Sequence, residues 1–269
     1  MKVQPVLDAN LLGAPGWLWP DHVEEFEREC AHLLDERKLI TMSITCYLLR
    51  SGGKTILVDT GLGARPRPQF PLGKLDSSLK ELGVAPADID IVILTHLHID
   101  HVGWNTVDGA DGSRQVFFPN AEFYIQQAEW DFWMTPEWLE KPGYECLGEC
   151  VEPLRDTGRV RFMKGDEAIT EDLTFVATPG HTPGHVAVGM FSAGERAILV
   201  GDASHHPVQL NHPDWSASAD VDGELAHRTR EKLFREAEAD QRMFIAGHWT
   251  FPGAGRIVRL DGKRVFQAL

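Results

Sequence analysis

The segment Thr95-His96-Leu97-His98-Ile99-Asp100-His101-Val102-Gly103 places three imidazoles and one carboxylate within six consecutive positions. It directly follows the apolar run Ile91-Val92-Ile93-Leu94, which predicts a short buried strand. The histidines therefore occupy the turn at the carboxyl end of that strand, where α/β proteins usually hold ligands. Imidazole nitrogens suit zinc, copper, iron or nickel, and a carboxylate beside them hardens the donor set. The segment predicts a metal site wrapped by a tight loop.

Three further candidate ligands stand just beyond other apolar runs. Asp202 follows residues 197–201, His248 follows residues 243–247, and His181 lies in a Gly/Pro-rich loop after residues 173–177. A polar turn that is merely rich in histidine would not explain this repeated placement at strand ends. The pattern predicts one shared site with seven metal ligands: His96, His98, Asp100, His101, His181, Asp202 and His248.

The order H-x-H-x-D-H, Gly-His, Gly-Asp, Gly-His resembles the metallo-β-lactamase superfamily of binuclear metallohydrolases. The turn Asp59-Thr60-Gly61 also matches that family, and the similarity runs from about Lys54 to His248. The resemblance implies an α/β fold, a four-layer αββα sandwich. It implies one metal on His96, His98 and His181, a second on Asp100, His101 and His248, and Asp202 as the bridge. Asp59 would orient the ligand loop, the usual role of a carboxylate behind a metal-binding histidine.

The whole chain favours a single domain over residues 1–269. Its length and its 43% hydrophobic content suffice for one large core, no linker divides it, and the ligands are spread over both halves. Residues 1–10 lack the pattern of a signal peptide. No apolar stretch approaches the roughly 18–20 residues that span a bilayer. Four cysteines without a disulfide framework indicate a reducing compartment. We therefore expect a cytoplasmic protein that does not bind membranes.

The formal net charge of −14 argues against nucleic acid as a partner, because an acidic surface repels phosphate backbones. We expect a small uncharged molecule as the substrate, and an oligomer is possible.

Local patterns predict the main elements. Residues 21–38 predict an amphipathic helix capped by Asp21, and residues 41–50 and 54–58 predict a hairpin closed by 51–53. Further helices are expected over 74–82, 126–133 and 223–238, and a strand over 89–95. Residues 203–215 read as a loop.

Two groups of residues are candidates for contact with a substrate. Part of the aromatic cluster 130–138 and the loop Trp17-Leu18-Trp19 either roof the metal site or belong to the ordinary core. His205, His206 and His212 lie on the loop that leaves Asp202, whereas His185 is expected to be structural.

The donor set favours two Zn²⁺ ions, with Mn, Fe or Co as alternatives. Two ions about 3.5–4 Å apart would share a hydroxide, and Asp100 could orient it and carry a proton. In the diiron oxidoreductases of the superfamily an acidic residue stands where His98 stands here, so this chain favours hydrolysis.

The resemblance extends to the bacterial lactonases, which implies a hydrolase of a small ester or lactone. Those lactonases carry a tyrosine three residues after the bridging aspartate, whereas this chain has His205. His205 could donate a proton or hydrogen bond to the substrate oxygen in place of that hydroxyl. An arylesterase or organophosphate triesterase is the alternative. A mononuclear-iron persulfide dioxygenase and a glyoxalase II are further, less favoured readings.

Overall fold

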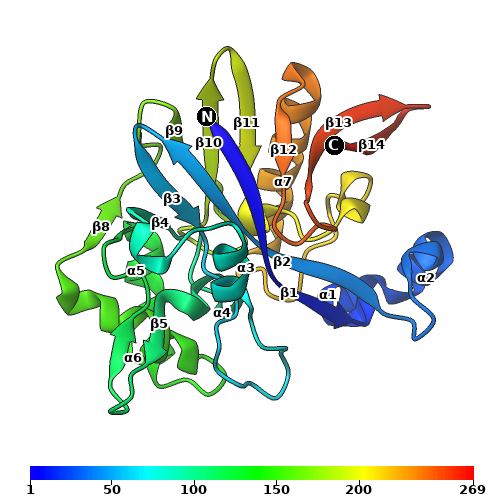
Figure 1. The fold of residues 1–269 in the computed structure, drawn as a ribbon. Coiled ribbons are helices and arrows are strands. Elements are labelled where there is room, and N and C mark those ends of the chain that lie inside the picture. Colours follow the sequence, from blue (N-terminus) through cyan, green and yellow to red (C-terminus); the bar gives the residue numbers. More distant parts are fainter.

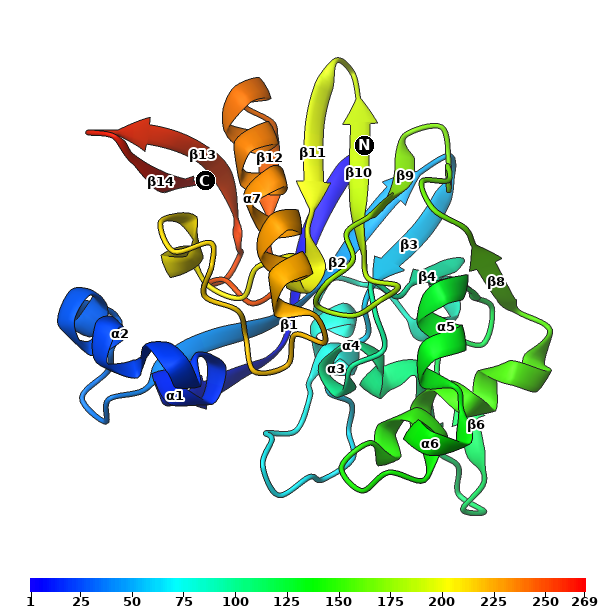
Figure 2. The same ribbon diagram turned by 180° about the vertical axis from the view of Figure 1, so that it is seen from behind.

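The computed structural model describes residues 1–269 as two six-stranded sheets that face each other, with helices on their outer sides (Figures 1 and 2). The first sheet has the order β1 (Lys2–Gly13), β2 (Ile40–Ser51), β3 (Lys54–Val58), β4 (Ile91–Ile93), β7 (Glu122–Gln126), β8 (Val160–Met163). The second has the order β14 (Lys263–Ala268), β13 (Ala254–Leu260), β12 (Met243–Ile245), β11 (Glu195–Leu199), β10 (Val186–Ser192), β9 (Leu173–Ala177). Strands β5 (Thr106–Asp108) and β6 (Arg114–Val116) pair separately.

The helices are α1 (Pro15–Leu18), α2 (Val23–Cys30), α3 (Leu75–Glu81), α4 (Ile99–Val102), α5 (Gln127–Trp133), α6 (Pro136–Leu139) and α7 (Gly223–Asp240). Helices α3, α4 and α5 contribute to the core cluster on the first sheet, and α7 covers the outer face of the second (Figure 2). This arrangement is the predicted αββα sandwich.

The central strands are apolar on both faces because each lies between two hydrophobic layers. In β3, Leu57 packs beneath the helices, whereas Ile56 and Val58 pack between the sheets. In β10, Ala187 packs toward α7, whereas Val186 and Val188 meet the first sheet. Strands buried on both faces lose the polar alternation of a half-exposed strand, which explains the continuous apolar runs in the sequence.

Strand direction brings the metal-site loops to one edge. Strands β3 and β4 run parallel, as do β11 and β12. Strand β10 is antiparallel to both β9 and β11, so β9 runs in the direction of β11. The carboxyl ends of β9, β11 and β12 therefore lie at the same edge of the second sheet.

Most predicted elements are present, and one helix was predicted too long. The hairpin, the strand before the histidines and the helices α3, α5 and α7 lie where the patterns placed them. The predicted helix 21–38 is instead two 3₁₀ turns, Pro20–His22 and Ala31–Leu33, around α2, and Asp21 does not cap it. Leu34 still packs on the core cluster of α2, but the polar residues 35–38 that follow offer no further apolar side chain to bury, so the helix does not continue.

The first two strands form a long antiparallel ribbon that projects toward α1 and α2 (Figure 1). Its end packs around the fully buried Trp19 and Phe26, with Trp215 from the loop beyond β11. No helix of the chain combines the length and the apolar character needed to cross a bilayer.

Candidate metal centre

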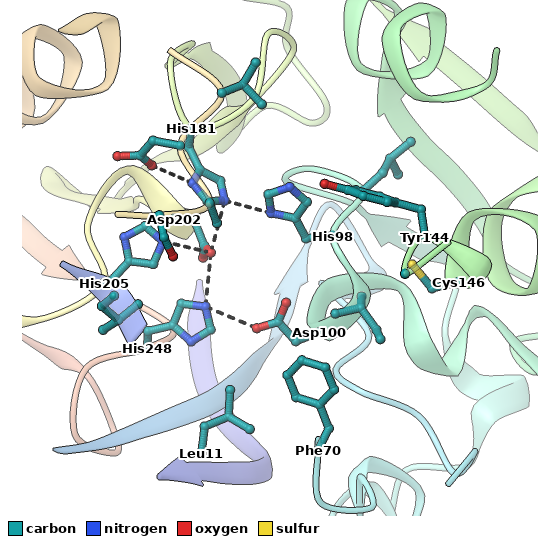
Figure 3. A pocket seen from close by; sticks show the side chains of 18 of the residues that line it. Leu11, Phe70, His98, Asp100, Tyr144, Cys146, His181, Asp202, His205 and His248 are labelled. Carbon is teal, nitrogen blue, oxygen red and sulfur yellow. Dashed lines mark hydrogen bonds and ion pairs between the residues drawn. The ribbon is translucent and has the colours of Figure 1, made fainter. Parts of the chain in front are cut away.

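The loops that follow β4, β9, β11 and β12 meet around one cavity of about 510 Å³. Figure 3 shows the side chains of His98, Asp100, His181, Asp202 and His248 turned toward a common centre. The short strand β4 and the one-turn helix α4 hold residues 96–101 as the tight loop that the sequence predicts.

Three imidazoles form the first group of donors. His181 Nε2 lies 2.9 Å from His98 Nδ1 and 3.2 Å from His96 Nε2, and the last two atoms are 3.2 Å apart. A zinc ion with Zn–N bonds of about 2.0–2.1 Å separates tetrahedral ligand nitrogens by about 3.3 Å. The three nitrogens therefore have the spacing of one shared ion.

The second group contains Asp100, His101 and His248. His248 Nε2 lies 3.4 Å from an oxygen of Asp100, and His101 Nε2 lies 3.8 Å from the other oxygen. The relevant donor atoms of these three side chains all fall within 4.8 Å of one another. Two imidazoles and a carboxylate suit a borderline ion such as zinc.

Asp202 stands between the two groups. One of its oxygens lies 3.2 Å from His101 Nε2, and the other lies 3.1 Å from His248 Nε2 and 3.4 Å from His181 Nε2. The structure thus brings all seven predicted ligands together and places the predicted bridge between both sets. Their assignment as ligands remains a prediction.

Four of the histidines have a partner on Nδ1, which leaves Nε2 pointing into the site. His101 Nδ1 lies 2.9 Å from Asp59, and His181 Nδ1 lies 2.8 Å from Asp220. His248 Nδ1 donates to the backbone oxygen of Ser43 at 3.0 Å, and His96 Nδ1 lies 3.1 Å from the hydroxyl of Thr95. When the Nδ1–H group donates to such a partner, the proton stays on Nδ1. The lone pair on Nε2 is then free to bind a metal.

Asp59 lies where the sequence placed it, behind the ligand loop. Its carboxylate accepts hydrogen bonds from the backbone N–H and the hydroxyl of Thr95 as well as from His101. Its backbone has φ of +59°, a left-handed conformation that aspartate tolerates better than most residues. The Asp59 turn therefore joins both ends of the histidine segment.

Asp220 is a supporting residue that the sequence did not reveal. It lies in the loop before α7, and its second oxygen accepts hydrogen bonds from Arg230 at 3.2 Å and from the N–H of Ala217. The side chains of Asp220 and Arg230 are both fully buried. Asp220 follows no apolar strand, so the strand-end pattern that exposed the other acidic residues could not find it.

Burial and neighbouring charges shift the pKa values of the site residues in opposite directions. Burial lowers the pKa of His248, but Asp202 and Asp100 outweigh it and raise that pKa to about 9. Burial raises the pKa of Asp202, but His248, His101 and His96 outweigh it and hold the pKa well below its usual value. Protonated imidazole supplies positive charge beside these carboxylates, a role that a bound cation would take over.

Two observations indicate that divalent ions fit here. His101 Nε2 and Asp202 Oδ1 are buried and lie 3.2 Å apart, yet neither atom makes a hydrogen bond. The cavity lining contains no Lys or Arg that could neutralise its aspartates. The donor set and its unmet charge therefore fit two divalent ions, one on each group with Asp202 shared.

Aromatic side chains form one wall of the cavity, and part of the predicted roof is correct. Trp133, Trp138 and Tyr144 line it, and the Trp133 ring lies 5.3 Å from the His98 ring. Trp17 and Leu18 also line it. Trp130 and Trp19 do not line it, because Trp130 packs on Phe162 and Trp19 lies in the core beneath the β1–β2 ribbon.

The histidines near the site that are not among the seven predicted ligands occupy different positions. His205 lines the cavity, with Nε2 3.4 Å from Asp202 and a buried Nδ1 that has no partner. His206 and His212 do not line it, so the prediction that they contact a substrate there is wrong. His206 Nδ1 accepts from the N–H of Val208, and His212 stacks on Trp215. His185 is structural as expected, because its Nε2 accepts from the N–H of Asp202.

Comparison with known proteins agrees with this site. The metallo-beta-lactamase superfamily model matches residues 40–107. The chain is 26% identical over 229 residues to N-acyl homoserine lactonase AiiA of Bacillus thuringiensis subsp. kurstaki, covering 78% of this chain and 83% of that protein. It is 31% identical over 182 residues to N-acyl homoserine lactonase AttM of Rhizobium radiobacter, covering 63% and 62%.

Two solved structures share the fold over nearly the whole chain. Hydrolase AbOPH of the beta lactamase superfamily superposes with a TM-score of 0.83 at 29% identity, covering 99% of this chain and 94% of that one. AidC, a dizinc quorum-quenching lactonase with a bound product, superposes with a TM-score of 0.84 at 25% identity and the same coverage. The fold and the donor cluster define an αββα metallohydrolase scaffold. This chain has the metallo-β-lactamase fold, and residues 40–107 match the model of that superfamily.

Proposed function

We propose that this protein is a binuclear metal-dependent hydrolase of small uncharged esters or lactones. The observation that carries the proposal is Asp202, which lies between two complete groups of donors at the floor of an apolar cavity. The named relatives, which are lactonases, support the same chemistry.

The metal pair would be held by His96, His98 and His181 on one side and by Asp100, His101 and His248 on the other, with Asp202 shared. When bound, two divalent ions supply Lewis acidity and lower the pKa of water, which is the chemistry that ester hydrolysis needs. The dizinc neighbour favours zinc as the ion. The protein then has to orient the ester and hold the transferred proton.

Asp100 is the residue that we assign to proton transfer. Its side chain is 14% exposed and lines the cavity, whereas the other carboxylate of the site, Asp202, is 5% exposed. A carboxylate that reaches both the second donor group and the open cavity can accept a proton from water and deliver it to the leaving oxygen.

His205 is assigned to the substrate oxygen. Its ring lines the cavity beside Asp202 and stacks on His248 at 5.7 Å. Burial lowers the pKa of His205, so near neutral pH the ring is an uncharged group that can donate one hydrogen bond. That donor would stabilise the charge that develops on the oxygen of the reacting ester.

The cavity lining favours an uncharged, apolar substrate. Thirteen of the 22 lining residues are hydrophobic, no Lys or Arg is among them, and Asp100, Asp202 and Asp220 supply negative charge. An anionic substrate would be repelled and would find no cation apart from the bound metals. The aromatic wall of Trp133, Trp138 and Tyr144 specifically favours an aryl ester or phosphotriester as the second candidate.

A substrate panel tests the proposal. The purified, zinc-loaded protein is assayed with lactones of varied ring and acyl tail, aryl esters, an uncharged phosphotriester, a phosphate monoester and a glutathione thioester. We expect turnover of the lactones or esters, with no turnover of the two anionic compounds. A clear preference for the phosphate monoester or the glutathione thioester would refute the assignment.

Metal analysis separates hydrolysis from the dioxygenase alternative. We expect about two zinc ions per chain and activity without oxygen, because the two donor groups exceed what one tetrahedral ion uses. One iron per chain with oxygen consumption would instead identify a mononuclear dioxygenase.

We also propose that residues 1–269 form one domain, because both sheets contribute to one core and both halves contribute to one site. All four cysteines are free and buried, which supports a reducing compartment such as the cytoplasm.

A further inference from the structure

Glu129, on α5, is a buried carboxylate that is not one of the seven donors. It contacts both of the loops that carry the first donor group. It is 1% exposed. Its Oε1 accepts hydrogen bonds from the N–H of Leu97 at 3.0 Å and from the indole N–H of Trp133 at 2.6 Å. Its Oε2 accepts from the hydroxyl of Thr182 at 2.7 Å and from the N–H of Gly184 at 2.9 Å.

These four bonds occupy the full hydrogen-bonding capacity of an ionised carboxylate. Three of the four partners are N–H groups that can only donate, and the Thr182 hydroxyl donates as well, so the arrangement favours the ionised carboxylate. Burial raises the pKa of Glu129, and the four donors oppose that shift. No Lys or Arg contacts the group, so its negative charge is balanced by dipoles alone.

The bonded positions are selective for one donor group. Leu97 lies between His96 and His98, Thr182 follows His181 directly, and Gly184 lies three residues after His181. These three histidines make up the first donor group. No hydrogen bond of Glu129 reaches Asp100, His101 or His248.

The same carboxylate fixes the aromatic wall. Trp133 donates to Glu129, and its ring contacts His98 on one side and Trp138 on the other, at centroid distances of 5.3 and 4.6 Å. The loop also packs closely on α5, because a Cβ atom at Gly184 would overlap the backbone of Glu129. Only glycine allows the loop to approach this carboxylate.

We propose that Glu129 is a positioning residue that sets the spacing of the first donor group and couples it to the Trp133 wall of the substrate cavity. It acts through the backbone of the two ligand loops and touches neither the metal donors nor a substrate. The metal part of this inference rests on the proposed binuclear function, whereas the ordering of the loops does not.

Hydrogen exchange measured by mass spectrometry tests the ordering of the loops. Glu129→Gln keeps the shape of the side chain but replaces one accepting oxygen with a donor, so two of the four N–H or O–H groups lose their acceptor. The lost pair belongs to one loop, because Oε1 serves Leu97 and Trp133 whereas Oε2 serves Thr182 and Gly184. We expect the segment that faces the new amide nitrogen, 95–98 or 181–185, to exchange about 5- to 150-fold faster, the effect of one lost buried hydrogen bond. Segments around His248 should be unchanged.

Two further variants separate geometry from charge. Asp131→Asn removes the same charge from the same helix, but Asp131 is exposed and accepts only from Gln127, so it should leave both segments protected. Glu129→Asp keeps the charge but is too short to span the two loops, so it should behave like Glu129→Gln. If Glu129→Gln fails to fold, Glu129→Asp and Gly184→Ala carry the test.

Zinc titration tests the effect on the donor group. Glu129→Gln should lower the affinity for one of the two zinc ions by about 10- to 100-fold and leave the affinity for the other unchanged. The KM for an apolar ester should rise together with this loss because the Trp133 wall moves, whereas Asp131→Asn should match the parent in both measurements.

Unchanged exchange in both loops would overturn the proposal, and so would faster exchange spread evenly over all strands, which would indicate general stability. An equal loss of affinity for both zinc ions would overturn the claim that Glu129 acts only on the first donor group. If the parent protein binds no pair of metals, the binuclear function fails, but the exchange experiment still decides the role of Glu129.

Discussion

The two halves of the molecule supply the same kind of donor by different routes. The first half delivers four donors from six consecutive residues, 96–101, at the end of β4. The second half delivers three donors from three loops, and His181 and His248 are far apart in the chain. A contiguous segment fixes its own internal geometry, whereas separate loops depend on the sheet and on contacts between distant residues.

The supporting carboxylates show the same difference. Asp59 is held by neutral donors from Thr95 and by His101, all close to the first strands. Asp220 is held by the buried guanidinium of Arg230, which also donates to the backbone oxygens of Ala203 and Pro213. The second half therefore needs a buried ion pair between α7 and a loop to do what a turn does in the first half.

The largest effect is expected for Asp202, the second-half residue that both donor groups share. Asp202→Ala should reduce bound zinc from two ions per chain to fewer than one. It should also lower kcat/KM by more than the roughly 10- to 100-fold that follows loss of an outer partner. Mass spectrometry of the metal content and the ester assay measure both quantities. A variant that retains two ions would show that each donor group binds its metal without the bridging carboxylate.

The two supporting carboxylates should differ in their effect on stability. Asp220→Asn leaves the buried Arg230 without its counter-charge and should cost about 3–5 kcal/mol of unfolding free energy. Asp59→Asn leaves one or two neutral donors unpaired and should cost about 1–3 kcal/mol. Urea unfolding at saturating zinc measures both. Equal losses would remove the distinction between the two halves.

A second substitution sharpens that comparison. Adding Arg230→Met to Asp220→Asn removes the unpaired charge, so part of the lost stability should return. The zinc affinity should stay about 10- to 100-fold below that of the parent protein, because His181 still lacks its carboxylate partner. Recovery of zinc affinity along with stability would show that Asp220 acts only through the fold.

The smallest changes concern two adjacent histidines of the second half. His205→Phe should keep both ions and lower kcat by at most about 10²- to 10³-fold, the effect of one lost oxyanion donor. His206→Phe should leave kcat within about twofold and cost about 1–3 kcal/mol of stability, because the N–H of Val208 loses its acceptor. Steady-state kinetics and unfolding curves distinguish these results, and an unchanged kcat in His205→Phe would exclude it from the reaction.

The sequence predicted the site well where local order determines it. The strand before His96, the tight turn and the Asp59 turn all depend on neighbouring residues, and each lies where it was predicted. Prediction was weaker for the aromatic residues, because the same sequence pattern serves both the hydrophobic core and the cavity wall. Trp130 and Trp133 lie three residues apart on α5 and both belong to the core cluster on the first sheet, yet only Trp133 also lines the cavity, because its ring reaches His98 whereas that of Trp130 packs on Phe162.

The sequence by itself predicted the seven candidate donors, because apolar runs and the polar residues that end them are properties of short segments. It predicted the αββα layers through its resemblance to the metallo-β-lactamase superfamily. The tertiary structure alone decided the roles of Asp220, Arg230, Glu129 and the adjacent pair His205 and His206. Asp220, Arg230 and Glu129 act through hydrogen bonds or an ion pair that form only after the two sheets have packed and the loops have met. The cavity that separates His205 from His206 also forms only then.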